Sequence, residues 1–137
     1  MWYRSLGALL CAVVLATAEL AGQTATAQGE PSSRGRPLSE WIADLKAPAP
    51  LTRNAAAYEI ASMGPAAATA VPALIDALDD EVPAVRFPVT VALGEIGPAA
   101  GDAVPRLLQM VEEDINDEVA AGARRAIKRI KPQALSQ

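Results

Sequence analysis

The sequence predicts an all-α fold in which about three helical hairpins stack side by side. A repeat of 33 residues supports this prediction, because the Gly-Pro and Val-Pro pairs of "ASMGPAAATAVP" at Ala61–Pro72 return in "LGEIGPAAGDAVP" at Leu93–Pro105. A recurring apolar pattern at i, i+3, i+4 and i+7 also supports it, because this spacing places side chains on one face of an α-helix. One hairpin cannot bury its apolar face alone, whereas copies in a row bury theirs against one another.

The first helix of each repeat is predicted from an apolar stripe that occurs three times. The members of the three stripes, in chain order, are Leu38, Trp41, Ile42 and Leu45; Val71, Leu74, Ile75 and Leu78; and Val104, Leu107, Leu108 and Val111. Pro72 and Pro105 stand at the predicted first turn of two of these helices, where a missing N–H group costs nothing. Trp41 shares its repeat position with two leucines, so we expect it in the core or at the end of the stack.

The second helix of each repeat has small or apolar side chains at three recurring positions. They are Ala56, Ile60 and Met63; Val89, Leu93 and Ile96; and Ala123, Ile127 and Ile130. Gly64 and Gly97 lie where a left-handed residue ends a helix, and the proline after each prevents continuation. The third copy comes one residue late because its turn, "EEDINDE", carries one more residue. There Lys131 replaces the glycine, and a cation suits the negative end of the helix dipole.

Three positions depart from the repeat pattern. Pro88 lies inside the second helix of the middle copy, where proline removes a backbone hydrogen bond and favours a kink. Ala120 replaces the arginine found at Arg53 and Arg86, and Glu59 stands where the other copies have alanine. We expect these departures to disturb the regularity of packing and to leave the fold intact.

The N-terminal residues have the pattern of a secretory signal peptide. Arg4 supplies a positive start, Leu6–Ala18 is apolar, and Ala25 and Ala27 are small residues at the positions that a signal peptidase requires. The apolar run closes before Glu19 and is shorter than the roughly 20 residues that span a bilayer. We therefore expect an exported protein of the periplasm, the cell envelope or the medium, with no stable membrane span after cleavage; a retained anchor is the alternative.

The chain divides into four predicted segments. Residues 1–27 form the signal peptide, and the polar stretch "QGEPSSRGR" at 28–36 forms a flexible tether. The repeat domain covers 37–132, in copies at about 37–66, 67–99 and 100–132, and 133–137 is a tail. With 137 residues the chain provides one small domain.

The composition argues against several classes of function. Twelve Lys and Arg face sixteen Asp and Glu, a formal net charge of −4, so binding of nucleic acid through overall charge is not expected. The sequence has no histidine, and cleavage after Ala27 removes Cys11, its single cysteine. The common Ser-His, Cys-His, zinc and diiron sites then lack their members, so we expect no enzyme, no cofactor and no metal. A site made only of carboxylates stays formally open.

Acidic clusters lie in the predicted turns, at 79–81 and 112–118. Neither cluster has the alternating Asp spacing and central glycine of a calcium loop. We expect them to cap helices and to face solvent. Arg53 and Arg86 share one repeat position, which predicts a ladder of ion pairs with these acidic turns; an anion site is the alternative.

Two long stretches of this chain resemble HEAT repeats. They are "TRNAAAYEIASMGPAAATAVPALIDAL" at Thr52–Leu78 and "VRFPVTVALGEIGPAAGDAVPRLLQMV" at Val85–Val111, and more narrowly they are similar to the HEAT-like repeats of phycobilisome lyases. The resemblance implies a short right-handed α-solenoid, an armadillo-like superhelix, whose second helices line a concave protein-binding side. Phycobilin lyases and deoxyhypusine hydroxylase are enzymes among the relatives, and the latter holds iron with histidine and glutamate.

A candidate partner surface remains when the buried positions of the second helices are set aside. Its three rows are Asn54, Tyr58 and Ser62; Phe87, Val91 and Glu95; and Ala121, Arg125 and Arg129. Residues four apart lie along one helix face, and aromatic and arginine side chains are common in interfaces. We expect an unknown protein partner here. The alternatives are that Tyr58 and Phe87 tuck between helices, that the stack forms a homo-oligomer through an end, or that the chain has a lyase-like or metal-dependent activity.

Overall fold

The computed structural model describes residues 29–136. Pro31–Gln137 forms one compact unit, and the fold described below is that of this unit. The predicted signal peptide, residues 1–27, and Cys11 lie outside the described residues.

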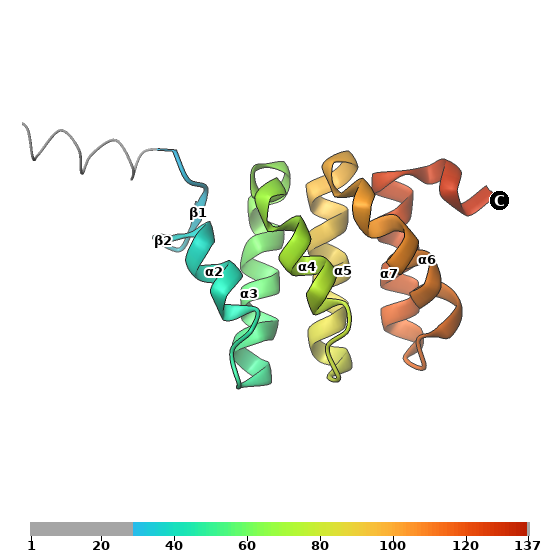
Figure 1. Cartoon of the computed structure of the whole chain (residues 1–137), viewed down its shortest axis with the longest axis horizontal. Helices are drawn as coiled ribbons and strands as arrows, with labels where there is room; N and C mark the ends of the chain where they lie inside the picture. The colour runs from blue at the N-terminus through green and yellow to red at the C-terminus, as the bar shows by residue number, and fades with distance from the viewer. Residues whose placement is uncertain (1–28, 137) are drawn as a thin grey trace, which may run out of the picture. The chain divides into compact units, whose positions relative to one another are not determined.

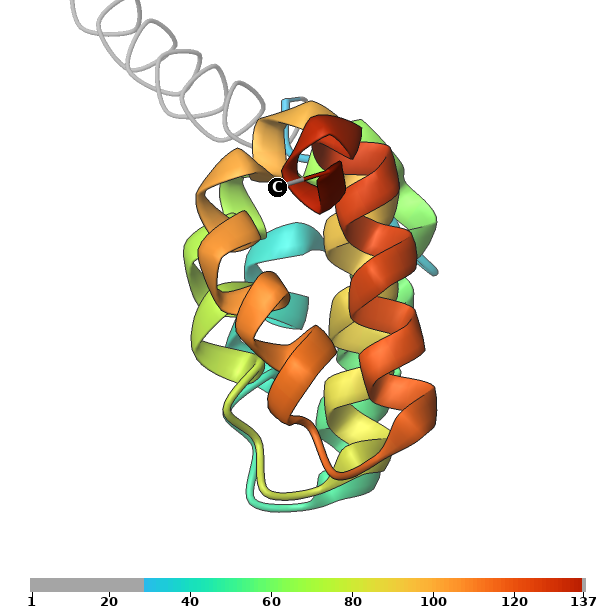
Figure 2. The ribbon, with the colours of Figure 1, turned by 90° about the vertical axis from the view of Figure 1, so that its right-hand side faces the viewer.

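The unit consists of two layers of helices (Figures 1 and 2). One layer holds α2 (Leu38–Asp44), α4 (Val71–Ala77) and α6 (Val104–Glu113), and the other holds α3 (Pro50–Met63), α5 (Pro83–Ile96) and α7 (Asp117–Ile130). A 3-10 helix joins the layers in the second and third repeats, η1 (Gly64–Ala70) and η2 (Gly97–Ala103). The prediction of an all-α solenoid of stacked hairpins is confirmed.

The core lies between the two layers and between neighbouring second helices. Leu74 and Leu107 of the predicted first-helix stripes are fully buried, as are Leu93 and Ile127 of the second helices. Small residues bring the second helices close together: a Cβ atom on Gly122 of α7 would lie 2.6 Å from the hydroxyl oxygen of a buried threonine on α5. The three hairpins therefore share one continuous core.

The two glycines predicted to end second helices do so. Gly64 has φ 56° and Gly97 has φ 79°, a region that glycine adopts without strain. Each is followed by proline and by the 3-10 turn that leads into the next first helix. The Gly-Pro pair thus sets the point where each hairpin returns.

Pro88 does not interrupt its helix, since α5 is continuous from Pro83 to Ile96. Proline cannot donate to the carbonyl four residues earlier, that of Ala84. The side chain of Asn54, on the neighbouring helix α3, donates to this carbonyl instead, with Nδ2 2.5 Å from the oxygen. The backbone hydrogen bond that Pro88 removes is thereby replaced by a side-chain hydrogen bond between repeats.

The prediction of a flexible tether at 28–36 is wrong for Ser32–Arg36. These residues belong to a β-hairpin in which β1 (Ser32–Ser33) pairs with β2 (Arg36–Pro37). Arg34 and Gly35 both have positive φ, as a two-residue hairpin turn requires. Ser33 Oγ donates to Glu59 of α3 at 2.6 Å, and Arg34 Nε lies 2.7 Å from the same carboxylate. Glu59 stands where later repeats have alanine, because a polar hairpin and not a preceding helix covers it.

Trp41 belongs to this N-terminal cap. Its ring is 8% exposed, its Nε1 donates to the carbonyl of Ser33 at 3.3 Å, and the Arg36 guanidinium lies 4.0 Å from its centre. The prediction that Trp41 lies in the core or at the end of the stack is confirmed. At the other end, η3 (Pro132–Ser136) takes up most of the predicted tail, and its Ala134 and Leu135 pack on the core.

One segment of the described residues, Pro50–Ala77, has the length and the apolar composition of a membrane-spanning helix. It comprises α3, η1 and α4, and the chain reverses direction at Gly64 between the two layers (Figure 1). The segment is thus a folded hairpin of the stack, and its apolar residues serve the core.

Candidate protein-binding surface

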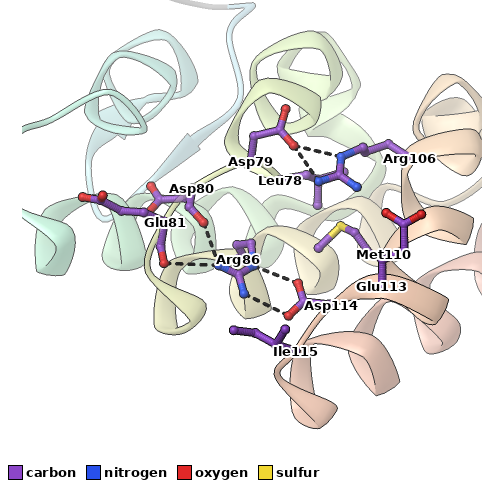
Figure 3. Close-up of a pocket in the computed structure, with 10 residues that line it drawn as sticks. All are labelled: Leu78, Asp79, Asp80, Glu81, Arg86, Arg106, Met110, Glu113, Asp114 and Ile115. Atoms are coloured by element: carbon purple, nitrogen blue, oxygen red, sulfur yellow. Dashed lines mark hydrogen bonds and ion pairs between the residues drawn. The ribbon is translucent and has the colours of Figure 1, made fainter.

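Arginines on α3 and α5 bridge successive repeats. Arg53 donates from Nε and Nη2 to the carboxylate of Asp80, at 2.6 and 3.0 Å, and from Nη1 to the carbonyl of Ala47 at 2.9 Å. Arg86 repeats this geometry: Nε and Nη2 donate to Asp114 at 2.9 Å each, and Nη1 donates to the carbonyl of Asp80 at 2.8 Å (Figure 3). The predicted ladder is confirmed, and each bidentate pair fixes the spacing of two repeats.

The carboxylates of the ladder remain charged at neutral pH. Burial acts to raise the pKa of Asp80 and of Asp114. The hydrogen bonds from Arg53 and Arg86, with a backbone N–H group at each carboxylate, outweigh this effect, and each pKa lies below the ordinary value of 3.8. The ladder therefore consists of ionised, hydrogen-bonded groups that are largely withdrawn from solvent.

The ladder ends within the repeat domain on both sides. Ala47 occupies the position of the acidic residue in the first repeat, and Ala120 occupies the position of the arginine in the third. Within residues 29–136, no second helix precedes the turn at Ala47, and α7 belongs to the last repeat. The substitution at Ala120, a departure in the sequence, thus falls in the last repeat of the described residues.

Two further residues of the acidic turns, Asp79 and Asn116, also have structural contacts. Asp79 pairs with Arg106 at 2.7 Å beside a hollow of about 330 Å³ (Figure 3). Asn116 caps α7, since its Oδ1 accepts from the N–H groups of Glu118 and Val119 at 3.1 and 3.0 Å. In residues 29–136, no group of three or more His, Cys, Asp or Glu side chains is placed to hold a metal ion. Three carboxylates of the acidic turns, Asp79, Asp80 and Asp114, thus form ion pairs.

A groove of about 520 Å³ lies across the N-terminal ends of the second helices. Residues of α3 and of the N-terminal ends of α5 and α7, with the residue before each of these two helices, line it: Asn54, Tyr58, Val82, Pro83, Ala84, Phe87, Asn116, Glu118 and Val119. Tyr58 is 46% exposed, and Phe87 is half-buried against the core. The groove therefore has an apolar interior between two aromatic side chains and polar groups at its edges.

The predicted partner surface is brought together only in part. Asn54, Tyr58 and Phe87 line the groove, and the Arg125 guanidinium lies 5.9 Å from the centre of the Phe87 ring. Val91 is half-buried and packs on the core. This half of the surface, Tyr58, Phe87, Val91 and Arg125, presents apolar and cationic groups on one face.

The other predicted surface residues make contacts inside the fold. Asn54 bonds the carbonyl next to Pro88, as described above, and Ser62 Oγ donates to the carbonyl of Glu59 at 2.6 Å. Arg129 donates to both oxygens of Glu95, at 2.6 and 2.9 Å. Ala121 is exposed. Asn54 and Arg129 thus join neighbouring second helices, and Ser62 bonds within its own helix.

The sequence analysis did not predict three apolar residues that line the groove at the start of α5 and α7, Val82, Pro83 and Val119. It considered only positions four apart within the second helices, and these three lie at or before the first helical turn. A signal was present, since Val82 and Pro83 are apolar residues directly after an acidic run.

The outer side of α7 carries cations where the other second helices carry small residues. Arg124 corresponds to Ala57 and Thr90, which are fully buried, and Lys128 corresponds to buried Gly94. In the earlier repeats the next second helix packs at these positions, whereas in the third repeat both cations are exposed. Long charged side chains here oppose the close approach of a further hairpin.

Stacked two-helix units, joined by repeated arginine pairs and offering one face of their second helices, define an α-solenoid of repeats. The sequence model of the family described as HEAT repeats matches residues 38–128, more than half of the chain. The chain therefore belongs to the HEAT-repeat family. Neither a curated protein nor a solved structure matches it.

Proposed function

We propose that this chain is a non-catalytic protein-binding scaffold that offers the exposed face of α3, α5 and α7 to a protein partner. The observation that carries the proposal is the groove between Tyr58 and Phe87, with Arg125 next to it. Tyrosine, phenylalanine and arginine are enriched at the centres of interfaces, where a pocket receives an anchor from the partner. HEAT repeats generally mediate protein–protein interactions, and the family match is compatible with this role.

The stack supplies a surface that is formed before binding. The arginine ladder fixes the spacing of the repeats, and Gly122 lets α7 approach α5 closely. A rigid surface loses little conformational entropy when a partner binds. Because little of the interaction energy is spent on ordering the surface, contacts in a small groove can support measurable affinity.

We also propose that the repeats are of the narrower type found in phycobilisome lyases and that the solenoid is right-handed. Catalysis is not part of the proposal, because the sequence contains no histidine for the common acid–base and metal sites. Self-association is the structural alternative. Arg124 and Lys128 disfavour self-association through the α7 end of the stack, since they replace the small residues at which the earlier hairpins pack.

We further propose that the protein is exported and acts in the periplasm, the cell envelope or the medium. The apolar run Leu6–Ala18 and the small residues Ala25 and Ala27 support this location. N-terminal sequencing of the protein from cell fractions tests it: we expect a mature chain beginning at Gln28 outside the cytoplasm, and a cytoplasmic chain beginning at Met1 would contradict it.

A crosslinking pull-down from native envelopes tests the binding role. Tyr58→Ala with Arg125→Glu removes one exposed aromatic ring and reverses one cation at the groove. Leu51→Ala with Lys46→Glu is the matched control, because it truncates an exposed apolar side chain and reverses a cation, and neither residue lines the groove. We expect the first variant to lose the partner and the control to retain it, both with native helicity.

Two results would contradict the binding role. Equal capture by the two variants would mean that the groove does not bind the partner. Absence of any partner, together with a mass that rises with protein concentration, would replace the scaffold by self-assembly.

A further inference from the structure

Two arginines among the described residues have no ion pair. The other arginines of residues 29–136 each contact a carboxylate, and they are Arg34, Arg36, Arg53, Arg86, Arg106 and Arg129. Arg124 and Arg125, on neighbouring positions of α7, are both exposed. The chain is acidic overall, so carboxylates for pairing are plentiful, but neither of these two arginines forms an ion pair within residues 29–136.

The unpaired cations lie on one strip of α7 beside the groove. A shallow hollow of about 330 Å³ follows this strip, with Ala121, Arg124, Arg125 and Lys128 along it. Phe87 connects the strip to the groove, because Arg125 lies over its ring and the ring also forms a groove wall.

We propose that the groove and the cationic strip of α7 together bind an acidic peptide segment that carries one apolar residue. The apolar side chain enters the groove between Tyr58 and Phe87, and the carboxylates that adjoin it pair with Arg125, Arg124 and Lys128. The partner is thus a protein with an exposed, acidic, extended stretch. This inference rests on the proposed binding function and names the class of partner for the same surface.

The spacing along α7 sets the spacing within the peptide. Val119, which lines the groove, and Arg125 are six residues apart, and Lys128 lies three residues further. At about 1.5 Å per helical residue, Arg125 and Lys128 lie about 9 and 14 Å beyond Val119 along the helix axis. An extended peptide advances about 3.3 Å per residue, so the acidic residues should follow the apolar one by about three to four positions.

A peptide fits this surface better than a nucleic acid. Glu118 lines the groove and Asp117 lines the hollow, so both parts of the site include a carboxylate. A polyanion with one charge on every unit would meet these carboxylates, whereas a peptide can place neutral residues opposite them. The net charge of −4 also weakens long-range attraction of a polyanion.

Fluorescence anisotropy with the full-length chain and labelled peptides tests the proposal. The peptide array contains one leucine or phenylalanine with three glutamates placed two to six positions away on either side. Control peptides replace glutamate by lysine or the apolar residue by serine, and a single-stranded oligonucleotide of the same charge serves as the competing polyanion. We expect the tightest binding when the glutamates lie three to four positions from the apolar residue.

Three protein variants locate the binding. We expect Arg125→Glu to weaken the best peptide about fivefold or more, since it removes one charge pair and adds repulsion. Tyr58→Ser should weaken it similarly and Tyr58→Phe should retain it. Lys46→Glu makes the same change of charge on an exposed loop without an ion pair and should leave affinity within about twofold.

The outcomes separate this inference from the binding function. Neutral or basic peptides that bind with the same dependence on Tyr58 would overturn the acidic partner and leave the scaffold role standing. Equal loss with Arg125→Glu and Lys46→Glu would reduce the effect to overall charge and overturn it. Tighter binding of the oligonucleotide would replace the peptide by a nucleic acid, and no binding of any acidic peptide would overturn the inference while the envelope pull-down still judges the scaffold.

Discussion

Replacement of Arg86 by alanine should lower the free energy of unfolding more than replacement of an exposed charged residue does. Arg86 makes two hydrogen bonds to Asp114 at 2.9 Å and one to a turn carbonyl at 2.8 Å, and the two side chains are 12% and 6% exposed. Removing one partner of a buried pair costs about 3–5 kcal/mol, because the other charge is left without compensation. Residual exposure lowers this figure, so we expect a loss of about 2–4 kcal/mol.

Urea unfolding followed by circular dichroism at 222 nm measures this loss. Arg129→Ala is the control, since its pair with Glu95 has similar geometry but side chains 56% and 38% exposed, and exposed pairs contribute less than about 1 kcal/mol. Arg86→Ala together with Asp114→Ala should cost less than the sum of the single changes. A loss from Arg86→Ala as small as that of the control, or strict additivity in the double variant, would refute the ladder as the joint between repeats.

Three further changes test the packing, the charges and the proline in turn. Gly122→Ala should destabilise the stack by about 1–3 kcal/mol in thermal unfolding, because the new Cβ atom meets a buried hydroxyl at 2.6 Å. Asp80 and Asp114 have pKa values below 3.8 in the fold, so stability should be full above about pH 4 and fall as the pH drops through these lower values, which urea midpoints at several pH values will show. Asn54→Ala should lower the melting temperature, and Pro88→Ala should reduce this effect by restoring a backbone donor to the carbonyl that Asn54 bonds.

Each of these predictions has a control. Gly101→Ala should leave stability unchanged or raise it, since a Cβ atom there meets nothing within 4 Å. The pH dependence should shrink when the ladder carboxylates become asparagine, and an unchanged profile would assign it to other groups. If Asn54→Ala lowers the melting temperature equally in the native chain and in the Pro88→Ala variant, the Asn54 amide does not substitute for the missing backbone hydrogen bond.

The helices and their order could be predicted because the signals repeat. Gly64 and Gly97 end two second helices at equivalent positions, and the apolar stripes return at a fixed spacing. The ladder could also be predicted, since Arg53 and Arg86 share one repeat position and an acidic turn follows in the next repeat in each case. Repetition shows which residues have equivalent neighbours, and that information is enough for the fold.

The ends of the stack could not be predicted in the same way, because each occurs once. The hairpin at 32–37 has polar strands, and contacts with Glu59 and Trp41 stabilise it. The local sequence pattern does not predict these contacts. The cross-repeat bond to Ala84 likewise depends on a helix about thirty residues away. The groove was half predicted, since its aromatic residues lie in the second-helix rows, whereas Val82, Pro83 and Val119 lie at the starts of α5 and α7, outside these rows.

Site-specific photocrosslinking in the native envelope tests the central claim most directly. A photoreactive phenylalanine analogue at Tyr58 reports on the groove, and the same analogue at Asp76, an exposed residue of α4 in the other layer, reports on the opposite layer. We predict that the first position crosslinks to one distinct protein and that the second does not. Crosslinks of equal yield to the same protein from both positions, or only to a second copy of this chain from Tyr58, would contradict a scaffold that binds its partner through the second helices.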